Sequence, residues 1–288
     1  MTAKLAIFLV LLILTASGFI HALYHRYHLF RLGGAEKRFD SLAKRLGSAL
    51  FSVLSQKRVI KARPVTGVMH FMVFWGFIIF ILGSLNHISE GFVGGFYLFG
   101  GSTFGFYYAA ILDFFAALVL VASVYFVVRR YLFRPPALTI PSRQSAIVLT
   151  FLITLMLSFF LYEGVRSLLD PSRVSGAWLG RLTAGWLQHI NLAEGGWSFF
   201  YGVFWWVHIL ILFGFVVYVP HSKHLHLIAG PINLIFQNRK PLGEVPFLDL
   251  EEAETYGVEK ITDFSWKDLL DLFACAECGR CQDQCPAY

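Results

Sequence analysis

Five long apolar stretches dominate the pattern of hydrophobic and polar positions. They cover residues 4–24, 67–89, 106–128, 144–163 and 198–220. Each reaches the ~20 residues that a helix needs to cross the hydrocarbon core of a bilayer. The first stretch continues through small residues to His21 and ends at Arg26, which predicts a retained helix and not a cleaved signal peptide. The pattern therefore predicts an all-α membrane protein built as a five-helix transmembrane bundle.

Composition and charge agree with this class and suggest an orientation. The chain is 57% hydrophobic and only 15% charged, against about a quarter charged in soluble domains. The net charge of +6 does not indicate nucleic acid binding, because basic residues cluster in two loops between spans. Segment 26–63 carries ten Lys/Arg and segment 129–143 carries four, whereas 90–105 carries none. Because basic loops stay in the cytoplasm, we expect a multi-pass protein of a bacterial or archaeal cytoplasmic membrane. Its N-terminus is expected outside and its C-terminus inside.

The chain becomes polar after the fifth span, which predicts three domains. Residues 1–228 form the transmembrane domain, and residues 229–264, rich in proline and acids, form a cytoplasmic linker. Residues 265–288 form the start of an iron–sulfur segment. Ser265 with Asp268 three residues later is typical of a capping box. It predicts a short helix that leads into the cysteines.

The four cysteines of the chain form one local motif. They are Cys275, Cys278, Cys281 and Cys285, followed by Pro286, in the pattern C-x2-C-x2-C-x3-C-P. This is the bacterial ferredoxin spacing, in which thiolates bind a [4Fe–4S] cluster. Structural zinc sites use two widely separated ligand pairs, and a disulfide does not suit a reducing cytoplasm. Because the chain stops three residues after Cys285, we expect a fragment whose second cysteine motif lies further on.

Histidines within the spans predict two haem sites. Ionisable residues inside a membrane are functional candidates by default. The second span carries His70 and His87, and the fifth carries His208, with His224 and His226 at its inner end. In a continuous helix His226 returns to the face of His208, ~27 Å further along. Since the two spans run in opposite directions, His87 is expected to pair with His208 near the outer side, and His70 with His226, His224 or His221 near the inner side.

Several other residues in or near the spans also carry expectations. Asp113 is either a proton relay for a quinone or an inter-helix hydrogen-bonding group. Glu90 is expected to be exposed in a loop, and Glu163 and Arg166 to lie at the outer interface. Gly83, one turn before His87, is expected to leave room for a porphyrin.

These residues resemble two known families. The five spans, their histidines and the run from Pro220 to Asn233 are similar to the gamma-subunit type of cytochrome b in nitrate reductases. The run from Trp266 to Pro286 resembles iron–sulfur oxidoreductases related to heterodisulfide reductase, which include electron-transfer-flavoprotein:menaquinone oxidoreductases. The resemblance implies two haems b, a menaquinone site and a soluble cytoplasmic donor such as an electron transfer flavoprotein.

The sequence thus predicts a membrane oxidoreductase that links a [4Fe–4S] cluster, two haems b and the quinone pool. One alternative is a heterodisulfide or sulfur-compound reductase whose catalytic cysteine-rich domains are missing from this chain. Another is a non-redox membrane anchor or transporter with a metal-binding tail.

Overall fold

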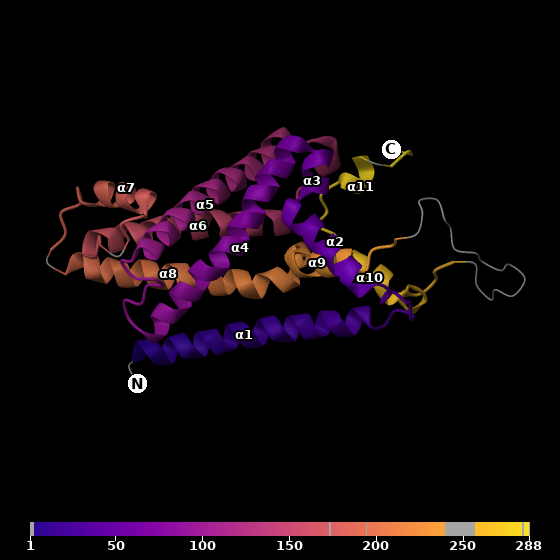
Figure 1. The fold of residues 1–288 in the computed structure, drawn as a ribbon, viewed down its shortest axis with the longest axis horizontal. Coiled ribbons are helices and arrows are strands. Elements are labelled where there is room, and N and C mark those ends of the chain that lie inside the picture. Colours follow the sequence, from indigo (N-terminus) through magenta and orange to yellow (C-terminus); the bar gives the residue numbers. More distant parts are fainter. Residues whose placement is uncertain (1–2, 173, 194, 240–256, 284, 288) are drawn as a thin grey trace, which may run out of the picture. The chain divides into compact units, whose positions relative to one another are not determined.

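The computed structural model describes residues 3–172, 174–193, 195–239, 257–283 and 285–287. Throughout these residues the regular elements are helices (Figure 1). Five of the described helices are long and apolar enough to cross a membrane, which confirms the predicted spans. The acids at positions 244–254 of the predicted linker lie outside the described residues. The domain boundaries at residues 228 and 264 stay a prediction.

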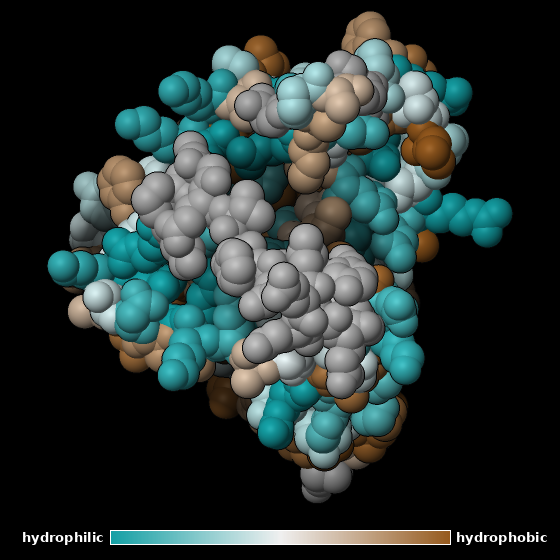
Figure 2. Space-filling model, turned by 90° about the vertical axis from the view of Figure 1, so that its right-hand side faces the viewer, coloured by the Kyte–Doolittle hydropathy of each residue, from teal (hydrophilic) through white to brown (hydrophobic). Residues whose placement is uncertain are grey.

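The spanning helices extend beyond their apolar cores. They are α1 (Ala3–Phe30), α4 (Pro64–Phe92), α5 (Thr103–Val127), α6 (Arg143–Leu169) and α8 (Gly196–Tyr218). A π-helical turn, Val128–Phe133, continues α5. The shorter helices are α2 (Leu42–Ser55), α3 (Lys57–Ala62), α7 (Trp178–Leu187), α9 (His226–Ile235), α10 (Trp266–Phe273) and α11 (Arg280–Asp283). In contrast to the apolar spans, the face shown in Figure 2 is mainly hydrophilic.

The chain divides into two compact units. The first comprises Met1–Ala16, Val59–Val217 and Gly279–Tyr288, and the second comprises Ser17–Arg58 and Tyr218–Cys278. Helices α4 to α7 and nearly all of α8 therefore belong to the first unit. The second unit holds α2, α9 and α10.

Small residues allow close helix packing in the first unit. A side chain at Gly76 of α4 would collide with Val119 of α5, so only glycine permits this approach. The ring of Phe8 in α1 occupies the space beside Gly91 of α4, where a Cβ would collide with it. The Phe8 ring centroid lies 5.6 Å from that of Trp205 in α8. The start of α1 is thereby packed against α4 and α8.

Backbone hydrogen bonds in the second unit hold the helix that precedes the cysteines. The predicted capping box is confirmed, because Ser265 and Asp268 cap each other's backbone at the start of α10. Gly34 donates to the carbonyl of Phe264 at 2.8 Å, and Trp266 donates to the carbonyl of Gly34 at 3.0 Å. The segment after α1 thus forms a short bridge with the start of α10.

Candidate functional site

Two buried histidines meet between α4 and α8. His87 of α4 is 3% exposed and His208 of α8 is 4% exposed. Their ring centroids are 4.6 Å apart and the ring planes are inclined by 52°. The indole of Trp205 donates a hydrogen bond to the His87 carbonyl at 3.3 Å, which helps to fix this turn of α4 against α8. The structure therefore brings together the two histidines that the sequence analysis paired near the outer side.

Ser158 of α6 determines which nitrogen of His208 is available. The Ser158 Oγ lies 2.9 Å from His208 Nδ1 and also donates to the carbonyl of Leu155 at 3.0 Å. A serine hydroxyl has only one hydrogen to donate. When that hydrogen goes to Leu155, Ser158 accepts from the Nδ1–H of His208, and the Nε2 nitrogen of His208 is then unprotonated and able to bind a metal.

The chemistry of this donor set suits haem b, which His87 and His208 would hold through their imidazole nitrogens. The Nδ1 of His87 is buried and has no hydrogen-bond partner within the described part of the chain. Metal–imidazole bonds are about 2 Å long, so two rings that share one iron have centroids roughly 6 Å apart. The observed 4.6 Å is shorter. In the observed arrangement the two rings are too close to share one iron. Haem binding at this pair would therefore require α4 and α8 to move apart.

Gly83 does not provide the space that the sequence analysis expected. A Cβ at Gly83 would lie 3.3 Å from Leu112 of α5 and 3.3 Å from the ring of Phe80. This glycine therefore faces α5 and serves close helix packing. The expectation was wrong because position along a helix does not specify which neighbour a residue faces.

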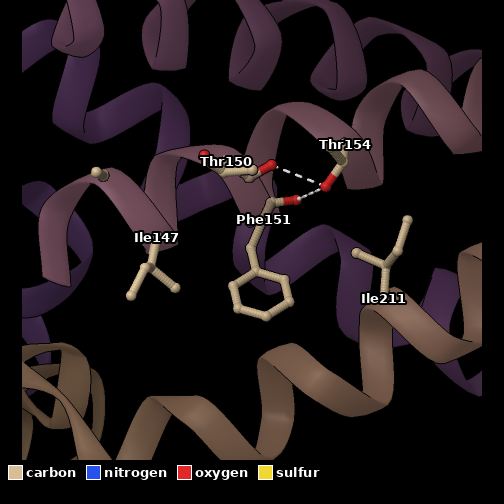
Figure 3. Close-up of a pocket in the computed structure, with 6 residues that line it drawn as sticks. Ile147, Thr150, Phe151, Thr154 and Ile211 are labelled. Atoms are coloured by element: carbon tan, nitrogen blue, oxygen red, sulfur yellow. Dashed lines mark hydrogen bonds between the residues drawn. The ribbon is translucent and has the colours of Figure 1, made fainter. Parts of the chain in front are cut away.

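A groove lies elsewhere, between α6 and α8. It has a volume of about 380 Å³ and is lined by Ala146, Ile147, Thr150, Phe151, Thr154 and Ile211. Figure 3 shows Phe151 and Ile211 projecting between the two helices. The Thr154 hydroxyl donates to the carbonyl of Thr150 at 2.8 Å, so the groove is apolar. It begins one turn from the Ser158–His208 hydrogen bond along both helices.

A buried polar network adjoins the His87 ring and was missed by the sequence analysis. Its members are Glu90, Tyr162, Glu163, Arg166 and Tyr201. Glu90 was expected to be exposed in a loop, but it lies within α4 and is 2% exposed. Glu163 and Arg166, expected at the outer interface, are 3% and 4% exposed. The expectation for Glu90 was wrong because α4 continues past its apolar core and Glu90 pairs with Arg166. The position of Glu163 and Arg166 at the outer interface stays a prediction.

Arg166 is the centre of this network. Its Nη2 lies 2.9 Å from Glu90 Oε2 and 2.8 Å from the Tyr201 hydroxyl, and its Nη1 lies 3.4 Å from Glu163 Oε1. Tyr162 and Tyr201 both donate hydrogen bonds to Glu90. Such pairing offsets the large cost of burying charges. The second carboxylate oxygen of Glu163 is buried without a hydrogen-bond partner in the described residues, so the network has spare capacity to accept a proton.

Tyrosine rings connect the network to the histidine pair and enclose it. The centroid of the Tyr162 ring lies 4.6 Å from that of the His87 ring. The guanidinium of Arg166 lies over the rings of Tyr162 at 4.6 Å and Tyr97 at 4.7 Å. Burial raises the pKa of Tyr97 well above its ordinary value, so its phenol stays neutral beside the ion pairs.

Asp113 binds the beginning of α7. Its Oδ2 accepts from the backbone N–H of Leu179 at 2.6 Å and of Gly180 at 3.1 Å. The first N–H groups of a helix have no intrahelical acceptor, and a carboxylate there is favoured by the helix dipole. The geometry matches the hydrogen-bonding alternative of the sequence analysis. The relay role of Asp113 stays a prediction.

Of the inner histidines, His70 lies on the expected span, whereas His224 and His226 lie beyond the end of α8. His70 lies on α4, in the first unit. In the second unit, α8 gives way to 3₁₀ turns at Val219–His221 and Lys223–Leu225, and α9 starts at His226. The helical phase drawn from His208 to His226 was therefore wrong, because Pro220 and these turns interrupt the helix. Burial lowers the pKa of His226, which favours the neutral imidazole that a metal needs. The pairing of His70 with His226 or His224 stays a prediction.

The cysteine motif follows α10 and divides between the two units. All four thiols are exposed and free of disulfides. Gly279, within the motif, has a φ of +77°, a conformation that strongly favours glycine. Among the described residues no three His, Cys, Asp or Glu side chains converge as a metal site. Ligation of a cluster by these cysteines therefore remains a prediction from their spacing.

Comparison with known proteins yields two relatives named as oxidoreductases and one named as a ferredoxin. The chain is 33% identical over 287 residues to the probable iron–sulfur-binding oxidoreductase FadF of Bacillus subtilis. It is 31% identical over 295 residues to the EtfAB:quinone oxidoreductase of Syntrophomonas wolfei. Both matches cover 97% of this chain but only 40% of the relative. A probable membrane-anchored ferredoxin of Chromohalobacter salexigens is 41% identical over 75 residues, which cover 22% of this chain and 11% of that protein.

No family model and no solved structure matches the chain. The chain spans about two fifths of the length of the two longer-matching relatives. Over nearly all of its own length, it is thus homologous to part of proteins named as an iron–sulfur-binding oxidoreductase and a quinone oxidoreductase.

Proposed function

We propose that the chain is the membrane-embedded part of an oxidoreductase that transfers electrons between a soluble cytoplasmic protein and the membrane quinone pool. The observation that carries the proposal is the buried His87–His208 pair, held by Ser158 between two apolar spans. Ionisable side chains in spans are rarely incidental. The cysteine spacing and the homologous oxidoreductases support the same function.

Three groups of residues hold the proposed cofactors. His87 and His208 would hold an outer haem b, and His70 would hold an inner haem b together with His226 or His224. Cys275, Cys278, Cys281 and Cys285 would hold a [4Fe–4S] cluster. When bound, these groups supply one-electron transfer, while the protein sets their spacing, burial and ligation.

The buried network gives the outer side its proton chemistry. A quinone takes up two protons with two electrons when it becomes a quinol, and releases both in the reverse reaction. Glu90 and Glu163 share the single guanidinium of Arg166, so one carboxylate can take up a proton while the other keeps its ion pair. We therefore assign quinone exchange to the outer haem, with Glu163, whose Oε2 has no hydrogen-bond partner in the described residues, as a proton-carrying group. The resemblance to the menaquinone-linked family makes menaquinone the expected quinone.

The soluble partner follows from the relatives. One of them is named as an oxidoreductase of EtfAB. An electron transfer flavoprotein is therefore the proposed partner on the cytoplasmic side, where the basic loops and the cysteine motif are expected. The N-terminus then lies outside.

A quinone-coupled spectrum tests this function. Purified full-length protein is reduced with dithionite, and a soluble menaquinone analogue is then added. We expect b-type absorption bands that are lost within the mixing time as the quinone is reduced. In the variant Glu163→Gln we expect the same bands but slower reoxidation. Material without b-type bands, or with bands that do not respond to quinone, contradicts the proposal.

A second function is favoured by one observation. The partial match to a membrane-anchored ferredoxin is consistent with an anchor that carries clusters but no haem. The same spectrum distinguishes the two, because the anchor shows iron–sulfur absorption without b-type bands.

A further inference from the structure

We infer that α2 lies in the membrane interface and binds the surface of an anionic phospholipid leaflet. The helix carries a leucine stripe at four-residue spacing, formed by Leu42, Leu46, Leu50 and Leu54. These side chains are 45%, 52%, 60% and 37% exposed. Residues four apart lie on one face of a helix, so the stripe is a continuous apolar surface. A soluble helix would turn such a surface toward the core.

The opposite face of α2 is fixed by polar contacts. Arg45, which is 4% exposed, bonds to Asp40 at 2.6 Å and to the carbonyl of Gln237 at 2.9 Å. It also reaches the carbonyl of Ile235, at the end of α9, at 3.3 Å. The helix therefore buries an arginine and exposes leucines. This inverted pattern is stable where the exposed side meets an apolar medium.

The neighbouring spans keep α2 close to a membrane. Only residues 31–41 separate α2 from the end of α1, and only residues 56–63 separate it from the start of α4. Eleven residues reach at most about 40 Å, even when fully extended. Both flanking helices are apolar enough to span a bilayer. An amphipathic helix tethered in this way has the lipid interface as its nearest apolar surface.

Charge selects the kind of lipid. Segment 31–63 contains nine Lys/Arg and two acids. Lys37, Lys44 and Lys57 are exposed and form no ion pair within the described part of the chain. Lysines at a membrane surface are attracted to anionic headgroups by about 1 kcal/mol each. Zwitterionic lipid provides no such attraction, so an anionic phospholipid such as phosphatidylglycerol is the expected ligand.

Photocrosslinking in native membranes tests the location of the stripe. Benzoylphenylalanine is introduced at Leu50, at Val121 as a lipid-facing control in a span, and at the exposed Lys260 away from α2. We expect lipid adducts at positions 50 and 121 and fewer at 260, detected by mass spectrometry of the full-length protein. The inference is overturned if position 50 crosslinks to protein, either a soluble partner or another part of a longer chain. It is also overturned if position 50 gives no lipid adducts.

A titration with defined lipid tests the charge selection. Protection of the detergent-solubilised protein against thermal unfolding is measured with phosphatidylglycerol and with phosphatidylcholine. Each of the changes Lys44→Gln and Lys57→Gln is expected to raise the half-maximal phosphatidylglycerol concentration roughly fivefold. Lys260→Gln, away from α2, is expected to leave it unchanged. Equal protection by the two lipids, or no shift in the α2 variants, refutes the lipid preference. Neither experiment depends on haem or quinone, so the redox proposal stands or falls separately.

Discussion

Replacing Ser158 by alanine is expected to loosen haem binding without unfolding the bundle. The Ser158 hydroxyl lies 2.9 Å from His208 Nδ1 in a site where Ser158 is 5% exposed. Alanine removes this hydrogen-bond partner and leaves the ring free to rotate or to change its tautomer. Both effects reduce the fraction of His208 that presents a bare Nε2 to iron.

The size of the effect follows from the burial of the pair. A buried donor that loses its partner costs about 1–3 kcal/mol. If that cost falls on the haem-bound state, haem affinity decreases roughly 5- to 150-fold. Loss of an outer-shell partner of a metal-binding histidine has a similar typical effect, about 10- to 100-fold.

The assay is the transfer of haem from purified protein to an excess of apomyoglobin. We expect Ser158→Ala to release its outer haem faster than wild type and to be isolated with less haem. Ser167→Ala is the matched control, because Ser167 lies on the same helix with a buried hydroxyl that has no hydrogen-bond partner in the described residues. Equal release rates in Ser158→Ala, Ser167→Ala and wild type would refute the assignment of Ser158 as a positioning residue.

Three further changes test the surroundings of the site. Arg166→Met leaves buried carboxylates without their cation and is expected to destabilise the protein by about 3–5 kcal/mol. Thermal unfolding should show that adding Glu90→Gln restores part of this stability. If it restores none, the Arg166–Glu90 pairing is contradicted. Gly91→Ala collides with a phenylalanine ring of α1 and should cost about 1–3 kcal/mol, whereas Gly94→Ala, with open space around it, should be neutral. Asp113→Leu removes two hydrogen bonds at the start of α7, so hydrogen exchange there should accelerate, while Asp113→Asn should preserve protection.

Hydropathy was sufficient to predict the spans because each apolar run is long and uninterrupted. It placed helix ends too early wherever a polar residue closed the run. Glu90 and Arg166 illustrate this, since each lies in a helix that continues and each finds a buried partner of opposite charge. The charge of a residue specifies its need for a partner, but the partner is decided by tertiary packing.

For the histidines, too, the sequence alone predicted only part of the site. Sequence spacing and antiparallel spans were enough to pair His87 with His208. Spacing was misleading for His226, because counting residues assumes a continuous helix and Pro220 ends α8. The role of Ser158 had no sequence signal, since a serine in a span commonly bonds to its own helix backbone.

The haem content of histidine variants tests the central claim most directly. Full-length protein is purified with His87→Ala, His208→Ala and the exposed control His189→Ala, and haem b is counted per chain from reduced-minus-oxidised spectra. The account predicts that each of the first two variants loses one haem b while folded protein is still recovered, and that His189→Ala retains the wild-type content. Wild-type haem content in folded His87→Ala and His208→Ala would contradict it.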